Sequence, residues 1–228
     1  MIKKIVAICS LLLSLNACIS VHVPNPIVAV NEQREVYWHS FGMIYAYDAG
    51  TTEPGLIGTS FAISDDEMIT AGHVCLSILT GQILRELEFS TRVTYLAGDK
   101  LKEIKDIEVV KMDTVNDLCL LKKKNHGLTP LKLAKSVSVG EDIRILGAPL
   151  GVFPMETDGK VMSLDSKHID KELAGKILLS APAFGGNSGG PIINEKAEVI
   201  GVLVMGARIY PQISFAVHLD ILKDFIHQ

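Results

Sequence analysis

Short segments rich in β-branched and aromatic residues, each bounded by Gly, Asp or Ser, recur along most of this chain. Segments of this kind are typical of strands joined by turns. Because few stretches with helical spacing lie between them, the pattern predicts an all-β sandwich or barrel rather than alternating β and α units. We expect strands at 42–47, 58–63, 67–70, 92–96, 104–111, 118–121, 142–146, 176–180, 198–205 and 214–217, and another after Pro191.

Two segments have apolar residues at helical spacing. Within residues 76–87, apolar side chains lie close to an i, i+3/i+4 pattern, which predicts a helix; they are Leu76, Leu79, Ile83, Leu84 and Leu87. At the other end of the chain, apolar positions within residues 219–226 predict a short amphipathic helix after Asp220 or a nearby cap.

The N-terminus has the pattern of an export signal. Lys3 and Lys4 precede an apolar run at 5–15, which is too short to span a bilayer. The run ends in Leu15-Asn16-Ala17-Cys18, which resembles the lipobox of bacterial lipoproteins, although Asn16 stands where a small residue is usual. We expect a lipid on Cys18; the alternative is a plain cleavable signal with Cys18 as a spare thiol.

This pattern divides the chain into a signal peptide at 1–17, a tether at 18–40 and a folded domain at 41–228. The signal contains two lysines and no acidic residue, so its removal takes the formal net charge from −4 to about −6. A chain without a basic excess cannot neutralise many phosphates, which argues against nucleic acid as the main partner.

A glycine-rich stretch, Gly185-Gly186-Asn187-Ser188-Gly189-Gly190-Pro191, lies between two apolar runs. Two glycines on each side leave Ser188 unshielded and allow backbone N–H groups to converge on one point, as an oxyanion hole requires. Taken alone, the stretch is more often a simple turn between strands. Ile192-Ile193 then continue as a strand rather than a helix, which does not fit the nucleophile turn of α/β-hydrolases.

A serine hydroxyl needs a base near neutral pH, and histidine is the usual one. Of the seven histidines, His73 stands out because it follows an apolar strand and the small residues Ala71 and Gly72. A carboxylate must also orient the imidazole. Asp117 abuts an apolar strand, where an unpaired acid is costly, and we prefer it to Asp113 in a more polar run.

Three blocks together resemble the signature blocks of trypsin-like serine proteases, in the order His, Asp, Ser. They are Thr70-Ala71-Gly72-His73, Asp117-Leu118-Cys119-Leu120-Leu121 and Gly186-Asn187-Ser188-Gly189-Gly190-Pro191. The nearest branch is the bacterial periplasmic Deg/Htr type, which Leu146-Gly147-Ala148-Pro149-Leu150-Gly151 and the later Gly159-Lys160-Val161 also resemble. Enzymes of that branch commonly carry PDZ domains; this sequence ends soon after Phe225, and we expect none.

The resemblance implies a definite fold and mechanism. It implies two packed six-stranded antiparallel β-barrels, with His73 and Asp117 in the first and Ser188 in the second. Ser188 would be the nucleophile, His73 the base and Asp117 its orienting acid, with the N–H groups of Gly186 and Ser188 holding the oxyanion.

The resemblance also indicates where substrate binds. The pocket would be formed by residues before Ser188, by the strand with Val204 and Met205, and by a region that includes Phe215. These residues are small or apolar, so we expect cleavage after small or medium aliphatic residues. His218 leaves open a preference for acidic residues.

Cys75 and Cys119 each follow a candidate catalytic residue by two positions. They could form a disulfide in an exported protein or remain buried thiols. No Cys-x-x-Cys or His-x-x-x-His spacing indicates a metal site, and we expect no cofactor.

The leading interpretation is an exported, lipid-anchored serine endopeptidase that acts on protein or peptide substrates. A catalytically inactive binding module with the same fold is the alternative from another class. An esterase with the same triad is less favoured, because the sequence shows no acyl-chain pocket.

Overall fold

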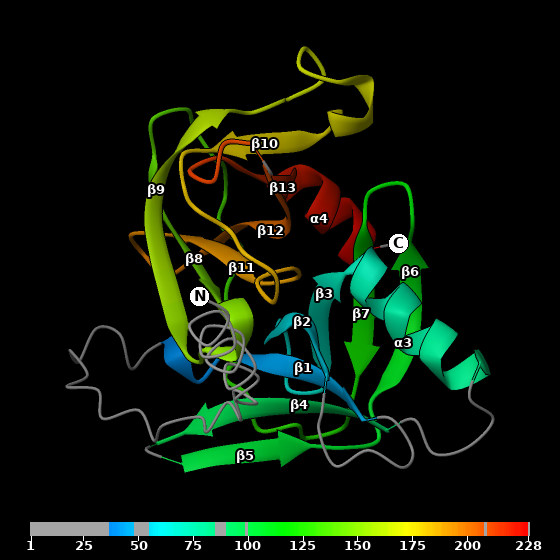
Figure 1. The fold of residues 1–228 in the computed structure, drawn as a ribbon. Helices are drawn as coiled ribbons and strands as arrows, with labels where there is room; N and C mark the ends of the chain where they lie inside the picture. Colours follow the sequence, from blue (N-terminus) through cyan, green and yellow to red (C-terminus); the bar gives the residue numbers. More distant parts are fainter. Residues whose placement is uncertain (1–36, 48–54, 85–89, 99, 208, 228) are drawn as a thin grey trace, which may run out of the picture.

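The computed structural model describes residues 37–47, 55–84, 90–98, 100–207 and 209–227, whose strands form two packed units (Figure 1). The strands of the first unit are β1 (Phe41–Tyr47), β2 (Gly55–Ala62), β3 (Glu67–Ala71), β4 (Ser90–Ala97), β5 (Lys100–Ile104), β6 (Glu108–Asp113) and β7 (Leu118–Lys122). Those of the second are β8 (Asp142–Gly147), β9 (Met155–Ser163), β10 (Lys176–Leu179), β11 (Pro191–Asn194), β12 (Val199–Gly206) and β13 (Ser214–His218). The helices are α3 (Gly72–Leu84) and α4 (Leu219–His227), with 3₁₀ turns at Pro149–Gly151 and Lys171–Leu173.

The second unit confirms the predicted six-stranded barrel. It closes in the order β10-β13-β12-β11-β8-β9, with every neighbouring pair antiparallel. Within it, β9 was not predicted as a strand. Most of its side chains are polar and only Val161 is fully buried, so it lacks the apolar alternation that marks a strand in sequence.

The first unit differs from the six-stranded barrel that the resemblance implied. It is a seven-stranded sheet in the order β5-β4-β1-β2-β3-β7-β6, and no ladder joins the end strands β5 and β6 to each other within the described residues. The extra strand is β5, which was not predicted and shares only Ile104 with the strand expected at 104–111; four of its five residues are exposed. Asp106 has a φ of +54°, which breaks the extended backbone between β5 and β6.

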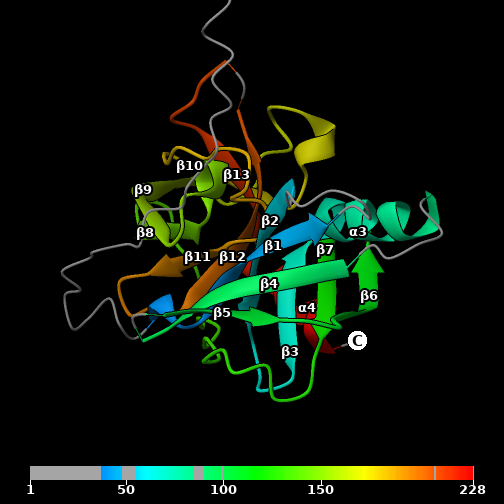
Figure 2. The same cartoon turned by 60° about the horizontal axis from the view of Figure 1, so that its bottom comes forward.

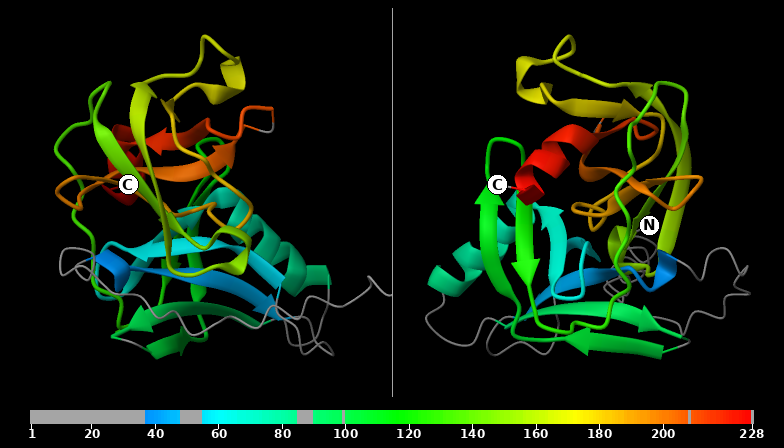
Figure 3. Two further views of the ribbon diagram at one scale, coloured as in Figure 1. Left: turned by 60° about the vertical axis from the view of Figure 1, so that its left-hand side comes forward. Right: turned by 180° about the vertical axis from the view of Figure 1, so that it is seen from behind.

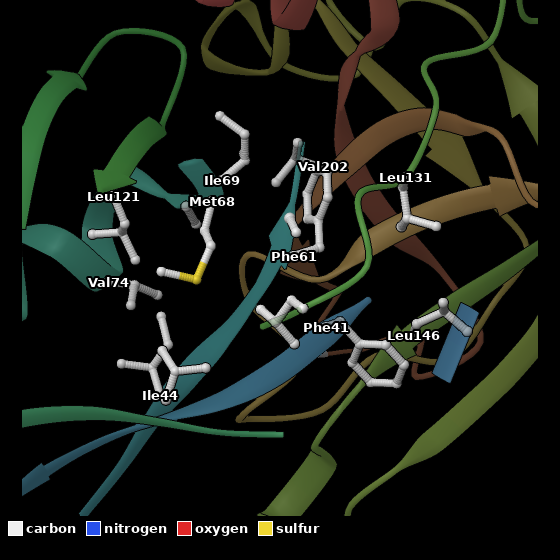
Figure 4. Close-up of a cluster of buried hydrophobic side chains, with 14 of the residues drawn as sticks. Phe41, Ile44, Phe61, Met68, Ile69, Val74, Leu121, Leu131, Leu146 and Val202 are labelled. Atoms are coloured by element: carbon white, nitrogen blue, oxygen red, sulfur yellow. The ribbon is translucent and has the colours of Figure 1, made fainter. Parts of the chain in front are cut away.

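A continuous apolar core joins the two units. Phe41, Phe61 and Met68 of the sheet pack in one cluster with Leu146 and Val202, which belong to barrel strands (Figure 4). A second cluster fills the barrel itself with inward-facing side chains from all six strands. The two units are therefore held face to face by burial of apolar surface.

The folded part includes residues before position 41, the expected first residue of the domain. Tyr37 and Trp38 were assigned to the tether, yet they are 3% and 5% exposed and belong to the core cluster. The preceding residues, including Cys18 and the whole signal segment, lie outside the described part of the chain. The sequence showed no periodicity here because only two aromatic side chains anchor the segment.

Helix α3 begins at Gly72, four residues before the predicted start, and the predicted end at Leu87 lies outside the described residues. It packs beside β3, β6 and β7 at one side of the sheet (Figure 2). Helix α4 confirms the C-terminal prediction and contacts both units (Figure 3). Its cap is His218, whose Nδ1 accepts the Asp220 N–H at 3.1 Å, rather than Asp220.

Candidate active site

His73 lies directly after β3, in the first turn of α3 rather than at a free strand end. Its side chain is 46% exposed. Gly72 allows the helix to start against the Asp117 loop, since a Cβ at this position would lie 3.1 Å from Asp117 Oδ1 and from the adjoining backbone. The small residue that the sequence analysis noted before His73 thus gives room for the carboxylate.

Three hydrogen bonds join the Asp117 carboxylate to His73. Its Oδ1 accepts the backbone N–H of His73 at 2.7 Å, and Nδ1 of the imidazole lies 2.9 Å from Oδ2 and 3.1 Å from Oδ1. Burial by itself raises the pKa of Asp117, but the hydrogen bonds and charge of His73, with the charge of Lys176, hold that pKa below its usual value. Asp117 therefore stays ionised beside the imidazole.

Asp113, the alternative acid, lies elsewhere in the same turn. Its carboxylate accepts the backbone N–H groups of Val115 and Asn116, each at 2.9 Å, and the Asn116 side chain at 2.7 Å. Although partial burial raises the pKa of Asp113, these hydrogen bonds outweigh it and lower that pKa. Asp113 shapes the turn and makes no contact with His73 among the described residues, in agreement with the preference for Asp117.

A disulfide lies beside this pair. Cys75 of α3 and Cys119 of β7 are bonded to each other across a sequence separation of 44, and both residues are fully buried. The sequence left a disulfide and free thiols equally open. Because each sulfur follows His73 or Asp117 by two positions, the bond ties together the two elements that carry these side chains.

Ser188 lies in the turn between β10 and β11, in the barrel. The Asn187 N–H donates to Phe184 O at 3.1 Å, and Gly186 has a φ of +103°, so residues 184–187 form a turn with the positive φ at its third residue that type II geometry requires. In the described part of the chain, the N–H groups of Gly186 and Ser188 donate to no protein acceptor. One backbone N–H donor is thus available on each side of Asn187.

Gly189 brings this turn against the sheet. A Cβ on it would overlap Thr70 Oγ1 and Thr59 O and would lie 2.7 Å from Ala71 N, and its φ is +86°. The Thr59 N–H also donates to Ser188 O at 2.8 Å. The serine turn therefore packs on the end of β3, two residues before His73. No hydrogen bond joins the side chains of His73 and Ser188 in the described structure.

Thr59 connects the two units and is in turn hydrogen-bonded by Thr70; neither was predicted to have this role, although Thr70 begins the first signature block. Thr70 Oγ1 donates to Thr59 O at 2.7 Å, and Thr59 Oγ1 donates to Gly186 O at 2.7 Å. Both threonines are fully buried. A polar side chain inside an apolar strand is a signal that sequence alone offers, because such a group needs a partner.

A hollow of about 460 Å³ opens beside Ser188. It is lined by Ala183, Phe184, Gly185, Ser188, Val204, Met205, Gly206, Ala207 and Pro211, none of which is charged. Two residues predicted to bind substrate, Val204 and Met205, are among them. Phe215 is 6% exposed and pairs with Met205 in the neighbouring strand without lining the hollow. His218 pairs with Gly201, farther along β12, and is not part of this wall.

Two absences concern the part of the chain that the structure describes. No group of three or more His, Cys, Asp or Glu side chains there could hold a metal ion. None of the helices found there combines the length and apolar character needed to span a bilayer.

The family model of the trypsin-like peptidase domain matches residues 58–202, which include His73, Asp117 and Ser188. The chain belongs to the trypsin-like peptidase family. This peptidase domain is similar to "Serine protease HTRA2, mitochondrial" of Bos taurus, with 30% identity over 79% of the chain and 38% of that protein. It is also 29% identical to "Probable periplasmic serine endoprotease DegP-like" of Halomonas elongata, over 86% of the chain and 42% of that protein. The chain thus spans less than half of the length of either relative.

Solved structures of the peptidase fold agree with this assignment. A serine endoprotease from Yersinia pestis superposes with a TM-score of 0.66 over 88% of the chain and 66% of that structure, at 18% identity, which shows the fold alone. The active form of the Rv3671c protease from M. tuberculosis gives a TM-score of 0.63 over 90% of the chain and 84% of that structure, at 25% identity.

Proposed function

We propose that the protein is a serine endopeptidase in which Ser188, His73 and Asp117 form the catalytic triad. The observation that carries the proposal is the hydrogen-bonded pair of His73 and Asp117 beside a serine turn whose N–H groups at Gly186 and Ser188 are free to bind an oxyanion. Membership of the trypsin-like peptidase family supports the same assignment.

In this mechanism Ser188 Oγ attacks the scissile carbonyl while His73 Nε2 takes the hydroxyl proton. Asp117 holds the proton on Nδ1 and stabilises the imidazolium that forms. The carbonyl oxygen becomes an anion and accepts hydrogen bonds from the N–H groups of Gly186 and Ser188. His73 then gives its proton to the leaving amine. In the second half of the reaction, His73 takes a proton from the water that attacks the acyl-enzyme and returns a proton to Ser188 Oγ as the acid product leaves.

Labelling with a fluorophosphonate tests this assignment. We expect the wild type to be labelled and Ser188→Ala to take no label, because it lacks the attacking oxygen. His73→Ala should be labelled at least about 10³-fold more slowly, because a serine without its base is a weak nucleophile. Ser138→Ala, at an exposed position in the β7–β8 connection, is the matched control and should label as the wild type does. Absence of labelling in folded wild type would favour a binding module, and labelling retained in Ser188→Ala would reject this nucleophile.

We also propose that the hollow beside Ser188 receives the side chain before the scissile bond and prefers small or medium aliphatic residues. The described residues that line the hollow are apolar or small, so a charged substrate side chain that entered it would lose its hydration without gaining a partner. Phe215 would support this wall from the neighbouring strand. A peptide library should show a preference of roughly tenfold or more for Val, Ala, Ile or Leu over Lys or Arg. Ala183→Asp should gain cleavage after Lys or Arg; a wild type that already prefers these residues contradicts the proposal.

Export and lipid anchoring at Cys18 are proposed from the sequence pattern and from the likeness to the Halomonas protein named as periplasmic. Mass spectrometry of the mature protein should find acyl chains on an N-terminal Cys18, and Cys18→Ser should remove them. An unmodified N-terminus at a later residue would contradict the anchor.

A further inference from the structure

Lys176, the first residue of β10, carries a buried ammonium group at the junction between the barrel and the sheet. The residue is only 5% exposed. Its Nζ donates a hydrogen bond to the backbone carbonyl of Asn116 at 3.0 Å, across 60 residues of sequence. Asn116 immediately precedes Asp117, so a barrel residue holds the peptide group from which the proposed triad acid extends.

A buried ammonium is costly unless other groups compensate its charge. Burial lowers the pKa of Lys176, and the negative charges of Asp117 and Asp113 offset part of that effect. Neither carboxylate forms a direct ion pair with Lys176 among the described residues. The contact with this turn therefore consists of the hydrogen bond to Asn116 and the longer-range attraction of two acids.

Lys176 contacts a turn whose backbone conformation must be stabilised by its surroundings. Asp117 has a φ of +62°, an uncommon conformation for a residue other than glycine, which persists only where the surroundings hold it. Asp113 secures the turn from within through the N–H groups of Val115 and Asn116. Lys176 secures it from the barrel, and β10 leads directly toward the turn that carries Ser188.

We propose that Lys176 is a positioning residue that holds the Asn116–Asp117 peptide, and through it the Asp117 carboxylate, in register with His73. This role rests on the proposed triad. It makes the geometry of the His73–Asp117 pair, which lies in the sheet, depend on a residue of the barrel that carries Ser188. A misplacement of about 1 Å in such a group can lower the rate by about 10²-fold.

The test replaces Lys176 by Met, which keeps much of the apolar stem and removes the cation and the donor. We expect kcat to fall by about 10- to 100-fold with KM within about twofold, because ground-state binding in the pocket is untouched. The Nδ1–H proton of His73, recorded by NMR with the ring protonated, should move or broaden because its hydrogen bond to Asp117 is disturbed. A purely structural role would leave that resonance unchanged in folded protein.

Lys111→Met is the matched control. Lys111 also donates from Nζ to a backbone carbonyl across the two units, that of Phe225 at 2.6 Å, but its amine reaches α4 instead of the Asp117 turn. It should keep the wild-type kcat and His73 resonance. Lys176→Gln, which retains a donor for Asn116 without the charge, should be intermediate, and it replaces Lys176→Met if that variant does not fold.

The outcomes separate the two proposals. Unchanged kcat and an unchanged His73 resonance in folded Lys176→Met overturn the positioning role and leave the proposed function standing, as does an equal effect of Lys111→Met. If the wild type cleaves and labels nothing while the resonance still responds to Lys176→Met alone, Lys176 does position the pair and the proposed peptidase activity is wrong.

Discussion

Asp117→Asn should lower kcat by about 10⁴-fold, with little change in folding. The physical reason is the tautomer of His73. Asp117 accepts hydrogen bonds from the backbone N–H and from Nδ1 of His73, so the proton sits on Nδ1 and Nε2 can act as base. An asparagine can turn its amide N–H₂ toward Nδ1, which places the imidazole proton on Nε2 and leaves no base for Ser188. Steady-state cleavage of a chromogenic peptide measures the loss.

Asp113→Asn is the control for this prediction, because it makes the same chemical change in the same turn at a carboxylate whose hydrogen bonds, within the described residues, come from Val115 and Asn116 and not from His73. We expect it to cost less than about tenfold in kcat. Equal losses in the two variants would mean that turn structure, rather than the imidazole tautomer, is responsible.

The lowered pKa of Asp117 also predicts how stability depends on pH. A carboxylate whose pKa is lowered by folding stabilises the native state above its unfolded pKa of about 3.9, and this contribution is lost as the pH falls through the lower folded value. The difference in free energy of unfolding between wild type and Asp117→Asn should therefore shrink as the pH falls below about 4. Urea titrations at a series of pH values measure it; a difference that grows as the pH falls below about 4 has the wrong sign.

Removal of the disulfide is expected to have the largest effect on stability. The bond closes a loop between Cys75 and Cys119, which are 44 residues apart. Chain-entropy arguments give about 4 kcal/mol for a loop of this length, through the greater freedom of the unfolded chain without the bond. The double variant Cys75→Ala/Cys119→Ala should lose about that much free energy of unfolding in denaturant titrations.

Wild-type protein reduced in denaturant and refolded with reductant separates the effect of the bond from that of the side chains. It should be destabilised by a similar amount, and the double variant should be insensitive to reductant. Because the bond joins α3 to β7, both forms should also lose cleavage activity per folded molecule. A double variant within about 1 kcal/mol of the oxidised wild type would contradict the entropic estimate.

Local patterns predicted much of the candidate site. The three sequence blocks placed His73, Asp117 and Ser188 at turns beside apolar strands, and the structure brings the first two into hydrogen-bond contact. The paired glycines around Ser188 predicted a turn with exposed N–H groups, which Gly186 and Gly189 form with positive φ. Their catalytic roles remain predictions that the variants above test.

The errors have local causes. Strands β5 and β9 were missed because most of their side chains are polar, and the strand predicted at 104–111 begins before β6 because the apolar residues Ile104 and Ile107 precede β6 in the sequence. Helix α3 was started late because Gly72 and His73 give no helical signal of their own. In each case the neighbouring strands decided the conformation rather than the pattern within the segment.

By itself, the sequence determined the residue types that carry chemistry, their order, the glycines at close approaches and most of the strands, because these depend on local conformation and alternation. Only the tertiary structure decided that Cys75 bonds to Cys119, that Thr59 holds the serine turn, that Lys176 reaches Asn116 and that the first unit has seven strands. Such contacts join residues 44 to 127 positions apart. They arise from strand order, barrel closure and the packing of two units on one core, which no local pattern encodes.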